Sequence, residues 1–411
     1  MIDYQSFVLE NGLKVLVHQD STTPVVAMNI LYNVGAKDED PELTGFAHLF
    51  EHLMFGGSVN IPKYDEPLQK VGGENNAFTN NDITNYYLTL PKENIETGFW
   101  IESDRMLNLA FSSKSLEVQR SVVIEEYKQR YLNQPYGDLW LLMRPLIYKV
   151  HPYKWATIGK NIKHIEDAKM EDVKDFYNRF YNPDNAIMVI AGDVEVEEVK
   201  KLSEKWFGPI NKKVDFNRNI PIEPKQTEAR FLQVERDVPA NTIFKAYHTC
   251  DRLSDDYVIT DIISDLLGNG KSSQLHQSLV VNKKFFNSIS CFISGDIHPG
   301  TIYIAGYLVD GVSPEEADKA IVEELAFFTS NTADEKNIQK VKNKFLAARE
   351  FSNLSILDKA MNLAYYELLG DANMVNTEVE KYMGITAEDI KRVSNGIFTK
   401  NNSNTLYYLK K

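Results

Sequence analysis

The spacing of apolar and polar residues divides the chain into short strand-like segments and longer helix-like segments. Apolar runs of about four to eight residues between turn residues are typical of strands, whereas apolar residues three and four apart predict helices. In the first half, strands are predicted at 7–9, 13–17, 25–32, 75–79, 83–90 and 186–191, and helices at 93–110, 115–131, 171–181 and 194–207.

The second half repeats this order of strands followed by helices. Strands are predicted near 231–248, 286–308 and 405–409, and helices at 254–267, 272–281, 313–329, 334–351, 355–369 and 386–395. Between the halves, residues 208–230 are rich in Pro, Lys, Asn and Glu, which is typical of a connecting segment. We therefore expect two similar α+β domains, 1–212 and 231–411, joined by a linker at 213–230.

The segment His48-Leu-Phe-Glu-His52 in the first domain has the residue types and spacing of a metal-binding motif. On a helix, imidazoles four residues apart leave the same face and suit two ligands of one tetrahedral zinc ion. Glu51 lies on the same side and can act as general base for a water that the metal activates. Thr44 is expected to cap this helix, and Gly56-Gly57 to end it.

The same residues also fit a half-buried amphipathic helix whose two histidines share a face by chance, because a bare H-x-x-E-H is common. A zinc site would need a third ligand from elsewhere in the chain. The remaining histidines have no partner at ligand spacing and are expected to be structural or exposed: His18, His151, His164, His248, His276 and His298.

Composition narrows the class of protein. The 411 residues are 43% hydrophobic and 25% charged, as in ordinary soluble proteins of two or three domains. The net charge of -13 argues against nucleic acid or an anionic membrane as partner. Two cysteines, Cys250 and Cys291, exclude a disulfide framework. Without a signal-peptide pattern or a membrane-length apolar run, a cytoplasmic location is expected, unless a leader has been removed.

A third ligand is available on the predicted helix 115–131, where Glu126 follows His52 by 74 residues (126 − 52). The H-x-x-E-H motif with this downstream helical glutamate resembles the pitrilysin-type (M16) zinc metallopeptidases. Other segments are similar to ones that recur in that family: 73–79, 84–86, 120–126, 151–153, 158–159, 181–185, 191–193, 268–270 and 272–275. The resemblance covers the first half densely and the second half loosely.

The resemblance implies a peptidase that binds one zinc ion per chain through His48, His52 and Glu126. Glu51 would be the general base, acting on a water in the fourth coordination position. The implied fold is α+β, with two tandem similar domains of the mitochondrial processing peptidase type. Each domain would have an antiparallel sheet with helices packed on one face.

Helical register separates Glu126 from its neighbour Glu125. Glu126 shares a face with Val122 and Val123, so it should point toward the packed side of the helix. Glu125 pairs with Ser121 and is more easily solvated. The family register also places the ligand at the second acid, which selects Glu126.

Residues 75–79 are expected to form an edge strand beside the site, to which an extended peptide can add through main-chain hydrogen bonds. Asn76 and Ala77 match family positions that hold the substrate backbone. Phe78 could line a side-chain pocket or pack in the core.

Two departures from the family pattern bear on activity. In the family a second glutamate commonly lies seven residues before the ligand. This chain has Gln119 there, which can hydrogen-bond to a ligand but carries no charge. Active members also carry an Arg and a Tyr, seven apart, which grip substrate and stabilise the oxyanion, and here Val280 and Asn287 stand at those positions. Family sites are enclosed by four such domains. A dimer is therefore expected, preferably with a homologous subunit that supplies the Arg and Tyr.

Three functions remain open on the sequence. The first is a zinc endopeptidase acting on peptides or unfolded polypeptide segments, the second a processing peptidase that removes targeting peptides. The third is a non-catalytic structural or binding subunit of the same fold. The intact set of His48, Glu51, His52 and Glu126 favours an enzyme over the third.

Overall fold

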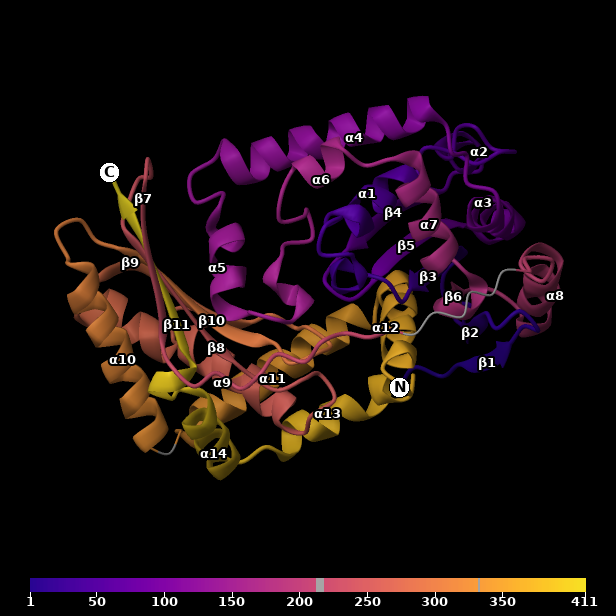
Figure 1. Cartoon of the computed structure of the whole chain (residues 1–411). Helices are drawn as coiled ribbons and strands as arrows, with labels where there is room; N and C mark the ends of the chain where they lie inside the picture. The colour runs from indigo at the N-terminus through magenta and orange to yellow at the C-terminus, as the bar shows by residue number, and fades with distance from the viewer. Residues whose placement is uncertain (212–217, 332) are drawn as a thin grey trace. The chain divides into compact units, whose positions relative to one another are not determined.

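The computed structural model describes residues 1–211, 218–331 and 333–411, and in it the chain forms two compact units (Figure 1). Unit 1 comprises Met1–Gln129, Trp155–Pro221 and Arg349–Thr377, and unit 2 comprises Arg130–Lys154, Ile222–Ala348 and Glu378–Lys411. Each unit contains one sheet packed with helices, which confirms the α+β class. Residues 213–217 of the predicted linker lie outside the described residues.

The sheet of unit 1 has six strands in the order β1-β2-β6-β3-β5-β4. The strands are β1 (Gln5–Val8), β2 (Lys14–Gln19), β3 (Val25–Tyr32), β4 (Glu74–Thr79), β5 (Thr84–Pro91) and β6 (Ala186–Gly192). Neighbours are antiparallel except β2 and β6, which run parallel because β6 enters the sheet between β2 and β3 after a long crossover. The sheet is therefore mixed, where a purely antiparallel one was expected.

Helices cover both faces of this sheet. They are α1 (Phe46–Leu53), α2 (Asp65–Lys70), α3 (Ile95–Leu107), α4 (Ser113–Tyr127), α6 (Lys163–Glu166), α7 (Met170–Phe180), α8 (Val196–Trp206) and α12 (Ile356–Leu368). On one face the Tyr86 hydroxyl of β5 donates to the carbonyl of Phe50 in α1, 3.3 Å away. On the other face Lys14 of β2 pairs with Glu367 of α12 at 2.9 Å. Helices were expected on one face only, and α12 covers the second face as well.

The sheet of unit 2 has five strands in the order β7-β11-β8-β10-β9. They are β7 (Arg230–Arg236), β8 (Thr242–His248), β9 (Phe286–Ile293), β10 (Thr301–Leu308) and β11 (Ser403–Lys410). This sheet is also mixed, because β7 and β11 are parallel. One face packs against α9 (Asp256–Gly268), α10 (Pro314–Ser330), α14 (Ala387–Ile397) and the π-helix His276–Asn282. On the other face, residues of α5 (Leu139–Ile147) join a cluster with Phe244, Tyr303 and Leu406.

Each sheet is therefore completed by a helix from the other half of the sequence. Helix α5 precedes the predicted linker but packs in unit 2, and α12 follows the linker but packs in unit 1 (Figure 1). Helices α11 (Glu335–Ser352) and α13 (Met374–Gly384) each contain a boundary between the units. Across the described ranges, no helix is both long and apolar enough to cross a bilayer.

Candidate metal centre

Helix α1, which carries the H-x-x-E-H residues, begins without a side-chain cap of its own. Gly45 occupies the N-cap position with φ 92°, and a Cβ there would lie 2.7 Å from the Ile158 carbonyl oxygen. Thr44, the predicted cap, instead places its Oγ1 3.0 Å from Nδ1 of His164. That prediction was wrong because the chain enters α1 in the left-handed conformation, which glycine adopts at little cost.

The carboxylate of Glu39 caps α1 from outside the helix. Its Oε2 accepts the N–H of Gly45 and its Oε1 accepts the N–H of Ala47, each at 2.9 Å. Glu39 is only 5% exposed. Burial raises the pKa of its carboxyl to about 8, although the two backbone hydrogen bonds act in the opposite direction. Sequence reasoning missed this residue, because an acid in a loop before a helix has no distinguishing motif.

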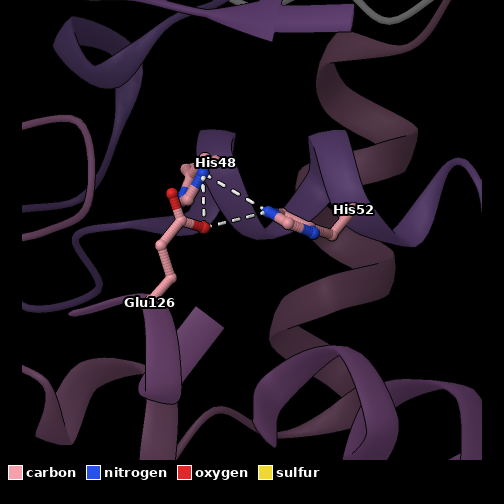
Figure 2. A group of neighbouring side chains, drawn as sticks. All are labelled: His48, His52 and Glu126. Atoms are coloured by element: carbon pink, nitrogen blue, oxygen red, sulfur yellow. Dashed lines mark hydrogen bonds and ion pairs between the residues drawn. The ribbon is translucent and has the colours of Figure 1, made fainter. Parts of the chain in front are cut away.

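His48 and His52 project from the same face of α1 and meet Glu126 of α4 (Figure 2). Their Nε2 atoms are 3.4 Å apart. Oε2 of Glu126 lies 3.5 Å from Nε2 of His48 and 3.4 Å from Nε2 of His52. All three side chains are partly accessible, at 12%, 24% and 17% exposure respectively. The structure thus brings the three predicted ligands together.

The register of α4 points Glu126 inward and Glu125 outward. The Glu125 side chain is 60% exposed and pairs with Lys128 at 2.6 Å. Val123 is buried, as the predicted register requires, but Val122 is 44% exposed. The expectation for Val122 was wrong because α4 buries only a narrow stripe of its surface.

The donor set fits a zinc ion. Two imidazole nitrogens and one carboxylate oxygen are ligand types of catalytic zinc sites. With zinc–ligand distances of about 2.0–2.1 Å, tetrahedral ligands stand about 3.3–3.4 Å from one another. The three donor–donor distances here are 3.4, 3.4 and 3.5 Å. Within the described part of the chain, no other three His, Cys, Asp or Glu side chains converge in this way.

Glu51 lies on α1 close to these residues and is held by β4. Its carboxylate accepts hydrogen bonds from the side chain and the backbone of Thr79. Burial raises the pKa of Glu51, and the Thr79 hydrogen bonds and His52 partly offset this rise. Thr79 was not predicted as a site residue, and its place in segment 73–79, which is similar to one that recurs in the family, was the only available signal.

Strand β4 forms an edge of the sheet, as expected. Ala77 stands opposite Tyr86, whose hydroxyl contacts α1, so Ala77 and Thr79 share the face toward the metal centre. Asn76 and Phe78 alternate to the other face, and Phe78 is 38% exposed. The side chain of Phe78 therefore neither packs in the core nor points toward α1.

Three positions depart from the family pattern: Gln119, Val280 and Asn287. Each is accommodated within its own unit. Gln119 is partly buried on α4, two helical turns before Glu126. In unit 2, Val280 packs against the hydrophobic core, and Asn287 donates its amide to the Leu308 carbonyl at 2.8 Å. Neither Val280 nor Asn287 offers a cation or a phenol.

Several of the other histidines are held within the fold by contacts of their rings. His18 and His248 contact backbone carbonyls at 2.7 and 3.1 Å. Nε2 of His151 lies 3.3 Å from Nδ1 of His298, a proximity that sequence spacing did not predict. Among the residues that the structure describes, no third Cys, His or carboxylate joins this pair as a metal ligand would.

Two family models match the chain. "Insulinase (Peptidase family M16)" matches residues 14–136, which contain α1, β4 and α4, and "Peptidase M16 inactive domain" matches 167–345. The "Zinc protease PqqE" of Helicobacter pylori (strain ATCC 700392 / 26695) is 30% identical over 416 residues, covering 98% of this chain and 92% of that protein. The chain belongs to the M16 family. His48, Glu51, His52 and Glu126 of this M16 chain all fall within the first of these two matches.

Solved structures show the same fold. The crystal structure of a protease from Helicobacter pylori matches with a TM-score of 0.92 and 28% identity, over 99% of this chain and 100% of that chain. The periplasmic protease PqqL from Escherichia coli matches with a TM-score of 0.79 and 18% identity. That match covers all of this M16 chain but 48% of PqqL, so PqqL is about twice as long.

Proposed function

We propose that this M16 chain is a zinc-dependent endopeptidase that hydrolyses extended peptides or unfolded segments of polypeptides. The observation that carries the proposal is the convergence of His48, His52 and Glu126 at the donor spacing of tetrahedral zinc (Figure 2). The protease name of the Helicobacter relative supports it.

Bound by these three residues, zinc would supply Lewis acidity, which polarises the peptide carbonyl and lowers the pKa of a water. Glu51 accepts a proton from that water while the oxygen of the water attacks the carbonyl carbon. Glu51 then returns the proton to the departing amine nitrogen as the C–N bond breaks, which leaves a carboxylic acid and an amine. The interactions with Thr79 favour the charged form of Glu51, which is the form that accepts a proton.

The edge position of β4 supports an extended substrate. A peptide in strand conformation can add to the outer backbone edge of β4 through main-chain hydrogen bonds. The small side chain of Ala77 lies on the face toward α1. Because this pairing requires an extended backbone, unfolded segments fit the edge and folded helices do not.

Metal analysis of matched variants tests the ligand set. Wild type is expected to bind about one zinc per chain, and His52→Ala and Glu126→Gln should lose most of it, because each removes one of three protein ligands. Glu125→Gln is the matched control, since Glu125 neighbours Glu126 but faces solvent. Undiminished zinc in His52→Ala, or equal loss in the two glutamine variants, would remove these residues from the site.

We further propose that full activity requires a homologous partner subunit that supplies an Arg and a Tyr. Val280 and Asn287 stand where the family carries that pair, and both are engaged in the packing of unit 2. The greater length of PqqL supports an assembly of two chains of this size. A missing oxyanion donor typically costs about 10²–10³ in rate.

A steady-state assay on an unfolded peptide, with and without such a partner, tests this requirement. The partner should raise the activity without changing the zinc content, and replacing its Tyr by Phe should abolish the gain. Full activity of this chain alone would contradict the partner proposal. Zinc binding without hydrolysis in either arm would favour a non-catalytic subunit.

A further inference from the structure

The position of α1 depends on contacts outside the helix. It has only eight residues, a length at which isolated helices are not stable, so tertiary contacts must hold it. The first N–H groups of any helix lack partners within it. Since the cap residue of α1 is a glycine, it supplies no side chain for them.

Glu39 supplies the missing acceptors with both carboxylate oxygens, one to Gly45 and one to Ala47. Gly45 and Ala47 are buried, so without Glu39 their N–H groups would be left as unpaired buried donors, which is costly. Ala47 directly precedes His48 in the chain. The two bonds therefore hold the turn from which the first imidazole projects.

Glu39 follows a short 3-10 helix, η1 (Ala36–Asp38), that is itself fastened. The Trp155 indole N–H donates to the Ala36 carbonyl at 2.9 Å, and Lys37 forms a buried ion pair with Asp82 at 2.9 Å. Asp82 lies in the turn that follows Thr79, which holds Glu51. The segment that caps the metal-binding helix is thus tied to the strand end that holds the base.

We propose that Glu39 is a positioning residue of the metal centre, which fixes the first turn of α1 and thereby sets the distance of His48 from His52 and Glu126. This inference rests on the proposed zinc site. It assigns no contact between Glu39 and the metal or the substrate.

The test measures the zinc dissociation constant of the full chain by competition with a chromophoric chelator. Glu39→Ala removes both acceptors and should weaken zinc binding about 10-fold or more, within the range of about 10–100-fold for outer-shell residues. Glu39→Gln keeps the side-chain volume and one acceptor oxygen, so its loss should be smaller, and it also decides the matter if the alanine variant does not fold.

Ser355→Ala is the control for a general loss of stability. Ser355 caps α12 in the same unit by accepting the N–H of Asp358, on the opposite face of the sheet from α1. Its zinc affinity should equal that of wild type. Wild-type affinity in both Glu39 variants, or equal weakening in Ser355→Ala, would overturn the positioning role while leaving the zinc site intact. A wild-type chain that binds no zinc would instead overturn the metal centre itself, and the inference with it.

Discussion

Glu51 and Glu126 are both glutamates beside the two imidazoles, but their neighbours give them different chemistry. Glu126 lies 3.4–3.5 Å from both ring nitrogens, the separation of two ligands of one ion. Glu51 accepts hydrogen bonds from Thr79, and its burial raises its pKa. A carboxyl whose pKa is raised toward neutrality is suited to take up and release protons.

Replacing Glu51 by Gln should therefore abolish peptidase activity and keep the zinc. The amide preserves the size of the side chain but accepts no proton, and loss of a general base typically lowers the rate by about 10²–10⁴. Turnover of an unfolded peptide in the assembly with the partner, with zinc content measured in parallel, checks this. Wild-type turnover in Glu51→Gln would assign the base to another group.

At this scale, helical spacing paired His48 with His52, whereas the resemblance to the M16 family selected Glu126 as the third ligand. His48, His52 and the inward face of Glu126 follow from helical periodicity. Glu39 could not be predicted, because its role depends on where a loop lies in space. Thr44 was misassigned for the same reason, since only the structure shows the left-handed entry at Gly45.

Among the elements, α1 has a start that depends on a single glycine. Gly45→Ala should lower the free energy of unfolding by about 2–3 kcal/mol, from the left-handed backbone and the contact of its Cβ with the Ile158 carbonyl. Chemical denaturation of the zinc-free chain measures this change. We also expect weaker zinc binding, because relief of the clash moves the first turn of α1.

Gly370→Ala is the matched control for this prediction. Gly370 lies in the same unit and has φ 115°, but a Cβ there would meet nothing within 4 Å. Gly370→Ala should lower the free energy of unfolding by only about 1–2 kcal/mol, from the left-handed backbone alone, and leave zinc binding unchanged. Equal effects of the two substitutions would show that the Ile158 contact is unimportant.

Element type was predictable where the apolar pattern is long. Strands β3 and β6 read directly as buried apolar runs, and α3, α7 and α8 as periodic helices. The short helices α2 and α6, of six and four residues, carry too little periodicity to be recognised. The parallel pairs β2–β6 and β7–β11 were missed because local sequence does not encode which distant strand becomes a neighbour.

In the whole molecule, each half of the sequence contributes a helix to the sheet of the other half: α5 packs in unit 2 and α12 in unit 1. The two halves therefore depend on each other for folding. A fragment of residues 1–230 lacks α12, so the apolar face of β3 and β6 would be bare. A fragment of residues 231–411 lacks α5, which covers Phe244, Tyr303 and Leu406. We expect neither fragment alone to show a cooperative thermal transition by circular dichroism, whereas the two co-expressed should form a stable complex.

A cooperative transition of fragment 1–230 at the melting temperature of the full chain would contradict this prediction. We predicted a helix at 355–369 but none at 139–147, and a helical pattern does not state which sheet it covers. The predicted linker places α5 in the first half of the chain and α12 in the second. In the structure α5 belongs to unit 2 and α12 to unit 1.

The contribution of α12 to the first sheet also has a consequence for folding during synthesis. The last strand of the first sheet ends at Gly192, but its covering helix α12 ends at Leu368, 176 residues later (368 − 192). At about 5–20 residues per second, a ribosome needs roughly 9–35 s to make that stretch. During this interval the nascent sheet has one uncovered apolar face, so chaperones that bind exposed strands have time to engage it. The metal-binding unit is thus largely synthesised well before the helix that completes its sheet.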